Sequence, residues 1–205
     1  TENDEGDLIE FHQYGTEYEE AGQLAEEIDR LAREGYEYKT MAVLYRTNAQ
    51  SRVFEERFMI KNIPYRIVGG TNFYQRKEIK DIICYLKAVD NGMDDLAVRR
   101  IINVPRRGIG AATIDKINTY AIEKNISFLD ACFQAEQITT LGNAKKKIQG
   151  FADMIQDFRD QEQQGSLEDL FHYILEKTGY TEGLKAEQTE EAEGRLENIN
   201  ELLNK

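Results

Sequence analysis

Residues 103–110 read Asn-Val-Pro-Arg-Arg-Gly-Ile-Gly, and they separate two stretches, 96–102 and 111–122, whose apolar spacing predicts helices. Pro105 disfavours helical backbone in the residue before it, so the first helix is expected to end there. Gly108 and Gly110 permit positive φ angles and a close approach to the backbone. Ile109 is expected to anchor the turn between the two helices. The stretch therefore predicts a helix-hairpin-helix-like motif with a glycine-lined turn.

The turn carries groups that suit a phosphate oxygen. The first amides of a helix have no intrahelical partner and attract anions, and Thr113 lies just inside the second helix. Arg106 and Arg107 add positive charge beside these amides. Such a site holds a nucleic-acid backbone without reading bases. A helix–helix turn that happens to contain two glycines is the alternative, but proline, two arginines, Gly-Ile-Gly and threonine together favour DNA.

A weaker second copy of this pattern spans residues 141–145, Leu-Gly-Asn-Ala-Lys. There the ordinary turn and the phosphate site explain the residues about equally well. Lys145 is the candidate contact in this second copy.

The remaining pattern changes character along the chain. Before residue 70, extended stretches at 8–14, 41–45 and 64–68 alternate with helical stretches after the Thr16 cap and over 49–60. Strand–helix alternation predicts a parallel α/β layer. From residue 73 onward the spacing is helical, including 128–133, 144–158, 167–177 and 195–203. The expected fold class is α/β followed by all-α, with domains over 1–72 and 73–205.

The charge is unevenly distributed. The chain has 205 residues, 40% of them hydrophobic, and a formal net charge of −12. Residues 1–45 carry −10, residues 46–107 carry +6 and residues 108–205 carry −8. A basic middle between acidic flanks fits a local phosphate-binding face. Ordinary solvated helix surface explains the same distribution equally well.

Several functional classes are disfavoured by the sequence. No apolar run approaches the roughly 20 residues that span a bilayer, and the acidic start has no signal pattern, so we expect a cytoplasmic protein without a membrane partner. Cys84 and Cys132 match no metal spacing and are expected to be free thiols. His12 and His172 are isolated, so no metal site is expected. The chain lacks an initiator methionine and stops within a helical pattern, which predicts a piece of a longer protein.

The segment over residues 43–52 is a second candidate site. It places Tyr45 to Asn48 at the end of a predicted strand and before a helix, where ligands bind in open α/β sheets. Arg46 can pair with a phosphate. Asn48 can either cap the helix or donate to a nucleotide, and the residues alone do not decide between these roles.

Four stretches in this order resemble the PcrA/UvrD type of superfamily 1 DNA helicases: residues 43–52, 63–70, 73–81 and 101–113. The resemblance covers nearly the whole chain and is strongest toward members from Gram-positive bacteria. It implies that residues 1–72 begin a RecA-like motor domain, called 2A. It also implies that residues 73–205 form most of that domain's helical insert, called 2B.

The resemblance also implies site residues and an activity. Contacts to single-stranded DNA would come from Arg46 and Asn48, and from Asn72, where relatives often have lysine. Contacts to duplex DNA would come from Arg106, Arg107, Gly108, Gly110, Thr113 and Lys145. The intact family protein unwinds DNA from 3′ to 5′ with ATP and Mg²⁺, in repair and replication, at the bacterial nucleoid. Expected partners are DNA, domains 1A and 1B, the rest of 2A, and repair or transcription proteins through 2B.

The chain contains no Gly-x-x-x-x-Gly-Lys-Ser/Thr phosphate loop. We therefore expect this chain alone to hold no cofactor and to be inactive as an ATP hydrolase. A protein-interaction or autoregulatory module of the same helicase is the alternative function, favoured by the acidic excess after residue 108. A stand-alone hydrolase using Asp94 and Asp95 is a weaker alternative, because acids are common at a helix start.

Overall fold

A computed structural model describes residue 6 and residues 8–203 of the chain. The chain divides into two compact units, Thr1–Phe73 and Tyr74–Lys205, a division that lies next to the 72/73 boundary drawn from the sequence. Each unit has its own apolar core, and each is described by itself.

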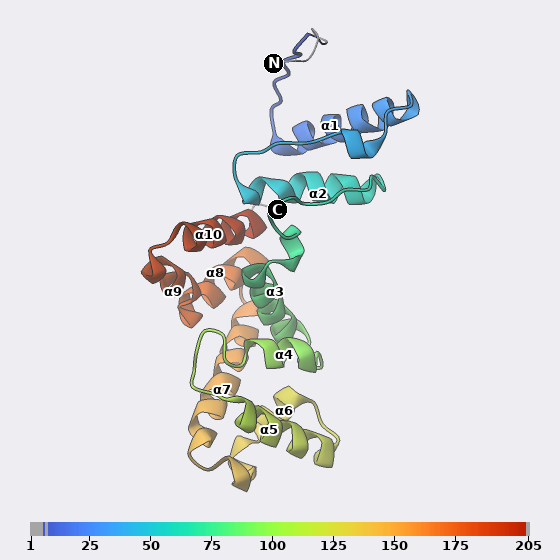
Figure 1. Ribbon diagram of the computed structural model, residues 1–205. Helices are drawn as coiled ribbons and strands as arrows, with labels where there is room; N and C mark the ends of the chain where they lie inside the picture. The colour runs from blue at the N-terminus through green and yellow to red at the C-terminus, as the bar shows by residue number, and fades with distance from the viewer. Residues whose placement is uncertain (1–5, 7, 204–205) are drawn as a thin grey trace. The chain divides into compact units, whose positions relative to one another are not determined.

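Unit 1 is built on two α-helices that pack against each other (Figure 1). Its helical elements are α1 (Glu17–Arg33), η1 (Tyr38–Thr40), η2 (Asn48–Gln50) and α2 (Ser51–Ile60), and η3 (Phe73–Gln75) begins at its last residue. The hydroxyl of Thr16 accepts the amide of Glu19 at 3.2 Å, which places the start of α1 where the sequence predicted it. The core between the helices consists of Ala21, Ala25, Ile28, Val53, Phe54, Phe58 and Ile63.

The predicted α/β layer is wrong. Among the described residues there is no β-strand, and the residues over 41–45 form neither helix nor strand (Figure 1). Met41, Val43 and Tyr45 pack on the core of unit 1, whereas Leu44 is 94% exposed. The same alternation occurs over 63–68, where Ile63 is buried and Val68 is exposed. Apolar residues at every second position show that one side of an extended segment is buried. A β-strand also needs a partner backbone for its hydrogen bonds, and these segments pair with none among the described residues.

Unit 2 is a bundle of helices around a larger core. Its elements are α3 (Lys77–Asp90), α4 (Asp95–Ile101), α5 (Ala111–Lys124), α6 (Phe128–Phe133), η4 (Ala135–Gln137), η5 (Thr139–Ala144), α7 (Lys145–Glu162), α8 (Leu167–Thr178), α9 (Tyr180–Glu187) and α10 (Glu190–Leu203). Every helix predicted after residue 73 is present, and α9 was not predicted. The core joins α3 through α8, and its fully buried members include Ile109, Phe151 and Cys132.

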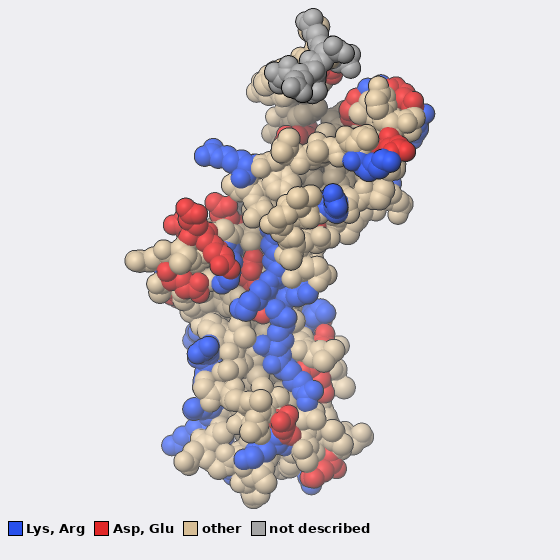
Figure 2. Space-filling view, viewed as in Figure 1, with Lys and Arg blue, Asp and Glu red and all other residues tan. Residues whose placement is uncertain are grey.

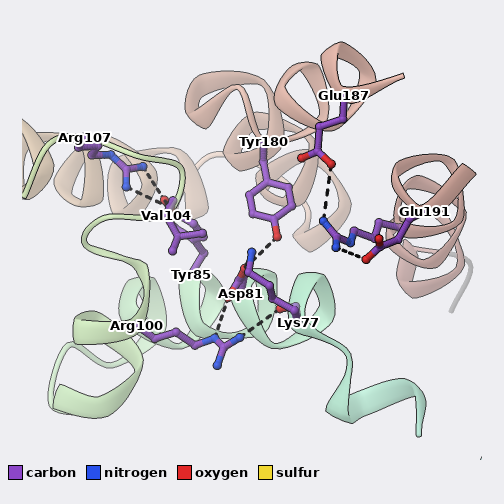
Figure 3. Close-up of polar contacts among 10 residues, drawn as sticks. Lys77, Asp81, Tyr85, Arg100, Val104, Arg107, Tyr180, Glu187 and Glu191 are labelled. Atoms are coloured by element: carbon purple, nitrogen blue, oxygen red, sulfur yellow. Dashed lines mark hydrogen bonds and ion pairs between the residues drawn. The ribbon is translucent and has the colours of Figure 1, made fainter. Parts of the chain in front are cut away.

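Buried polar contacts fix α4 and α9 to α3. The carboxylate of Asp81, 1% exposed, accepts from Arg100 Nε at 2.7 Å and from the hydroxyl of Tyr180 at 2.8 Å (Figure 3). Burial, with the nearby Asp81 carboxylate, raises the pKa of Tyr180 well above its usual value, so the phenol remains a donor. Arg76 and Glu78 hold Asn198 of α10 in the same way, at 2.6 Å each. The contact between Arg100 and Asp81 ties α4, the helix that leads into residues 103–110, to α3.

Candidate nucleic-acid interface

Residues 103–110, here the 103–110 loop, connect α4 to α5 in unit 2. Ile109 is 1% exposed and belongs to the core, so it anchors the turn as the sequence predicted. Gly108 has a φ of +70°, a conformation that L side chains rarely adopt, which explains glycine there. Gly110 has a φ of −90°, which any residue can adopt, and open space around it. Glycine is therefore not required there by the backbone conformation, but it leaves room beside the backbone.

The loop and the start of α5 present a group of unpaired amides. The side-chain oxygen of Asn103 accepts the amides of Arg107 at 2.8 Å and Ile109 at 3.1 Å. The amide of Thr113 bonds to the carbonyl of Gly110 at 3.0 Å. Within the described part of the chain, no partner is found for the amides of Gly108, Gly110, Ala111 and Ala112. Unpaired amides at a helix start favour an anion, because the helix dipole adds to their charge.

The two loop arginines differ in orientation. Arg106 is exposed, and its side chain has no partner among residues 8–203. Arg107 is turned inward (Figure 3): its Nη1 donates to the carbonyl oxygens of Ile101 at 2.9 Å and Val104 at 3.1 Å. Its Nη2 donates to the hydroxyl of Tyr85. Arg106 is therefore the loop arginine that is available to a ligand.

A lysine of α7 borders the 103–110 loop, and it is a different residue from Lys145, the candidate contact of the second pattern over 141–145. Lys147 is exposed and its Nζ donates to the carbonyl of Gly108 at 3.1 Å. Lys145 instead donates to the carbonyl of Glu136 at 2.5 Å and lies 3.7 Å from the carboxylate of that residue. Sequence reasoning missed Lys147, although it lies in a run of three lysines at a helix start, because only the packing of α7 shows which lysine reaches the loop.

Positive charge also lies on the neighbouring helices. Figure 2 shows a band of lysine and arginine side chains over α3 and α4. The basic residues of these two helices are Lys77, Lys80, Lys87, Arg99 and Arg100. Asp81 pairs with Lys77 and Arg100, and Asp94 pairs with Lys87, which lowers the net charge of this face. Lys80 is half-exposed and has no ion-pair partner in the described residues.

The predicted single-strand residues all lie in unit 1. Arg46 is exposed, and only its backbone amide is engaged, by the side chain of Gln50 at 2.9 Å. Thr47 is the N-cap of η2, with Gln50 closing a capping box, so Asn48 is not the cap. Asn48 lies beside Gly70, where an added Cβ would be 3.9 Å from its side-chain oxygen. Asn72 donates to the hydroxyl of Tyr65 at 3.4 Å.

The carboxylate pair considered for hydrolysis is structural. Asp94 is the N-cap of α4 and accepts the amide of Ala97 at 3.0 Å, which lowers the pKa of Asp94. Asp95 accepts the amide of Phe128 at 2.8 Å and so ties α4 to the start of α6. Both carboxylates stabilise helix ends, which explains them without catalysis.

The described residues contain no group of three or more histidine, cysteine or acidic residues that could hold a metal ion. No helix among them has the length and apolarity to cross a membrane. Both cysteines are free, as predicted: Cys132 is buried in the core and Cys84 is half-buried on α3.

Comparison with known proteins places the chain in a family. The family model for the UvrD-like helicase C-terminal domain matches residues 1–205. The chain therefore belongs to the family of UvrD-like helicase C-terminal domains, which confirms the resemblance noted in the sequence.

Two relatives are similar along almost the whole chain. Proteins named ATP-dependent DNA helicase PcrA are 43% identical in Staphylococcus epidermidis and 42% identical in Staphylococcus aureus, each over 203 residues. The matches cover 99% of this chain and 28% of each relative. The chain thus spans somewhat more than a quarter of the length of these relatives.

Proposed function

We propose that this chain is a DNA-gripping part of a DNA helicase, and that the 103–110 loop holds the backbone of duplex DNA. The observation that carries the proposal is the group of unpaired amides at the start of α5, with Arg106 beside them and Lys147 at Gly108. Membership of a helicase domain family supports the same conclusion.

The proposed contact is to phosphates. The amides of Gly108 and Gly110 donate to a phosphate oxygen, the hydroxyl of Thr113 lies in the first turn of α5, and Arg106 and Lys147 supply charge. Phosphate contacts carry no sequence information, so binding is independent of base sequence. Each neutralised phosphate releases counterions, so affinity falls as salt rises.

We infer a separate contact in unit 1, where Arg46, Asn48 and Asn72 bind single-stranded DNA. The exposed guanidinium of Arg46 supports this inference, since it can pair with a phosphate. Asn48 and Asn72 offer amide groups for a sugar or a base.

The activity proposed for the full-length protein is ATP-driven unwinding from 3′ to 5′ in repair and replication, in the cytoplasm at the nucleoid. In this proposal unit 1 begins motor domain 2A, unit 2 is most of subdomain 2B, and domains 1A and 1B are the other parts. The sequence has no phosphate loop, and the described residues contain no group of three or more histidine, cysteine or acidic residues that could hold a metal ion. Both ligands are therefore assigned to the rest of the protein, and no step of hydrolysis is assigned here.

A fluorescence anisotropy titration tests the duplex contact. The full-length protein is titrated onto a labelled DNA hairpin that has a single-stranded tail, at several salt concentrations. Gly108→Pro with Thr113→Ala is expected to weaken binding to the duplex part and to leave binding to a single-stranded oligonucleotide unchanged. Lys124→Gln, an exposed lysine at the far end of α5, is the control and should bind like wild type. Unchanged duplex affinity and salt dependence in the double variant would show that the loop does not bind phosphates.

A further inference from the structure

We propose that Asn103, Arg107 and Tyr85 are positioning residues, which hold the 103–110 loop so that its free amides face one phosphate. The inference rests on the proposed function, because it assigns these residues to the same duplex contact. It assigns Arg107 a role different from that of its neighbour Arg106, which is proposed to touch the DNA.

Asn103 determines which amides of the loop are already hydrogen-bonded within the protein. Its single side-chain oxygen accepts the amides of Arg107 and Ile109 and thereby turns both inward. The amides of Gly108 and Gly110 lie between and after these two and remain unpaired in the described part of the chain. The amides of Gly108 and Gly110 are therefore loop amides that a phosphate oxygen can use.

Arg107 fastens the loop to the end of α4. Besides Ile101 and Val104, its Nη1 lies 3.3 Å from the carbonyl oxygens of Ile102 and Pro105. The guanidinium also lies over the rings of Tyr85 and Phe151, at 5.9 and 5.7 Å from their centroids. A cation at a helix C-terminus satisfies carbonyls that have no intrahelical partner. With these contacts made inside the protein, the charge of Arg107 is not directed at a ligand.

Tyr85 completes the arrangement. It is fully buried on α3, its hydroxyl donates to the carbonyl of Val104, and it accepts from Arg107 (Figure 3). Burial raises the pKa of Tyr85 although Arg107 opposes this, so the hydroxyl keeps its proton. The hydroxyl of Tyr85 thus connects two residues of the loop, Val104 and Arg107, to α3.

A salt titration separates a positioning residue from a phosphate contact. Affinity falls as salt rises, and we call the magnitude of the negative slope of log K against log salt the salt slope; loss of one charged phosphate contact lowers the salt slope by about 0.9. Loss of a positioning residue lowers affinity at every salt concentration and leaves that slope unchanged, because the number of neutralised phosphates is the same. Arg106 and Arg107 are adjacent arginines, so they form a matched pair for this comparison.

The experiment measures duplex affinity of the full-length protein from about 50 to about 200 mM salt for Arg106→Gln, Arg107→Gln and Tyr85→Phe. Arg106→Gln is expected to lower the slope by about 0.9. Arg107→Gln and Tyr85→Phe are expected to weaken binding about tenfold and about threefold with unchanged slope, from lost hydrogen bonds. Tyr85→Phe removes one oxygen atom and keeps the ring, so it remains informative if Arg107→Gln fails to fold.

A second readout needs no DNA. Hydrogen exchange at the amide of Ile109 in the free protein is expected to quicken in Asn103→Ala and in Arg107→Gln, and to stay at the wild-type rate in Arg106→Gln. If Arg107→Gln lowers the salt slope as Arg106→Gln does, or if Tyr85→Phe binds like wild type, the positioning role is wrong while the proposed function stands. If Arg106→Gln and Gly108→Pro both bind duplex like wild type, the proposed function itself fails.

Discussion

The Nζ atom of Lys147 lies 3.1 Å from the carbonyl oxygen of Gly108, although the two residues are 39 positions apart in the chain. The contact brings the first turn of α7 against the 103–110 loop. It adds an ammonium group to the unpaired amides at the start of α5. It also leaves little space at Gly108, where an added Cβ would lie 2.6 Å from this Nζ atom.

The two nearby lysines of α7 are predicted to differ in DNA binding. Lys147→Gln should lower the magnitude of the negative slope of log K against log salt for duplex DNA by about 0.9, because an exposed charge beside the loop is lost. Lys145→Gln should leave the slope unchanged, since its ammonium group is held by Glu136. Anisotropy titrations of both variants measure this. If only Lys145→Gln reduced the magnitude of the salt slope, the phosphate contact would belong to Lys145 and not to Lys147.

Alanine substitutions of the two loop glycines are predicted to differ: one should lower stability, and the other should lower DNA affinity alone. Gly108→Ala should destabilise unit 2 by about 1 kcal/mol, because alanine is strained at a φ of +70°. Gly110→Ala should leave the melting temperature unchanged, since its backbone is extended and its surroundings are open. Gly110→Ala should nevertheless weaken duplex binding, because the new methyl group keeps the phosphate away from the backbone. Thermal unfolding and anisotropy of the same samples test this, and a stable Gly110→Ala protein with wild-type affinity contradicts it.

The buried Asp81 is predicted to hold unit 2 together. Asp81→Asn should lower the free energy of unfolding by roughly 2–4 kcal/mol, because Arg100 loses the charge that it pairs with. Tyr180→Phe should cost roughly 1–2 kcal/mol, since it removes only one hydrogen bond to the same carboxylate. Urea unfolding gives both values, with Tyr36→Phe on exposed Tyr36 as the neutral control. Equal stability of Asp81→Asn and wild type would remove this role.

The two cysteines are predicted to react at different rates with a thiol reagent. Burial raises the pKa of Cys132 well above its usual value, and it raises the pKa of the half-buried Cys84 as well. A raised pKa means less thiolate near neutral pH, so Cys84 should react slowly and faster as pH rises. Cys132 should react only after unfolding. Spectroscopic labelling with and without denaturant tests this, and fast modification of Cys132 in the folded protein would contradict the burial.

The local features of the interface were predictable from the sequence. Proline, glycine and the helical spacing on both sides located the 103–110 loop, because backbone conformation depends on nearby residues. The inward side chain of Ile109 followed from its position between two helices. The helix start at Thr16 followed from capping chemistry.

The features that depend on packing were not predictable. The period of two over 41–45 indicated a buried side correctly but could not show whether a second backbone pairs with it. The inward turn of Arg107 depends on Tyr85, a residue of α3, and the role of Lys147 depends on the placement of α7. A lone sequence shows that these residues are charged, but not which direction they face.

The measurement that tests the duplex contact most directly combines protein and DNA changes. Single phosphates of the duplex are replaced one at a time by neutral methylphosphonates, and affinity is measured for wild type and for Arg106→Gln in a double-mutant cycle. If the loop holds a phosphate, one or two adjacent positions will weaken wild-type binding and have a much smaller effect on Arg106→Gln, regardless of the base sequence. If every methylphosphonate has the same effect on both proteins, the 103–110 loop does not grip the DNA backbone.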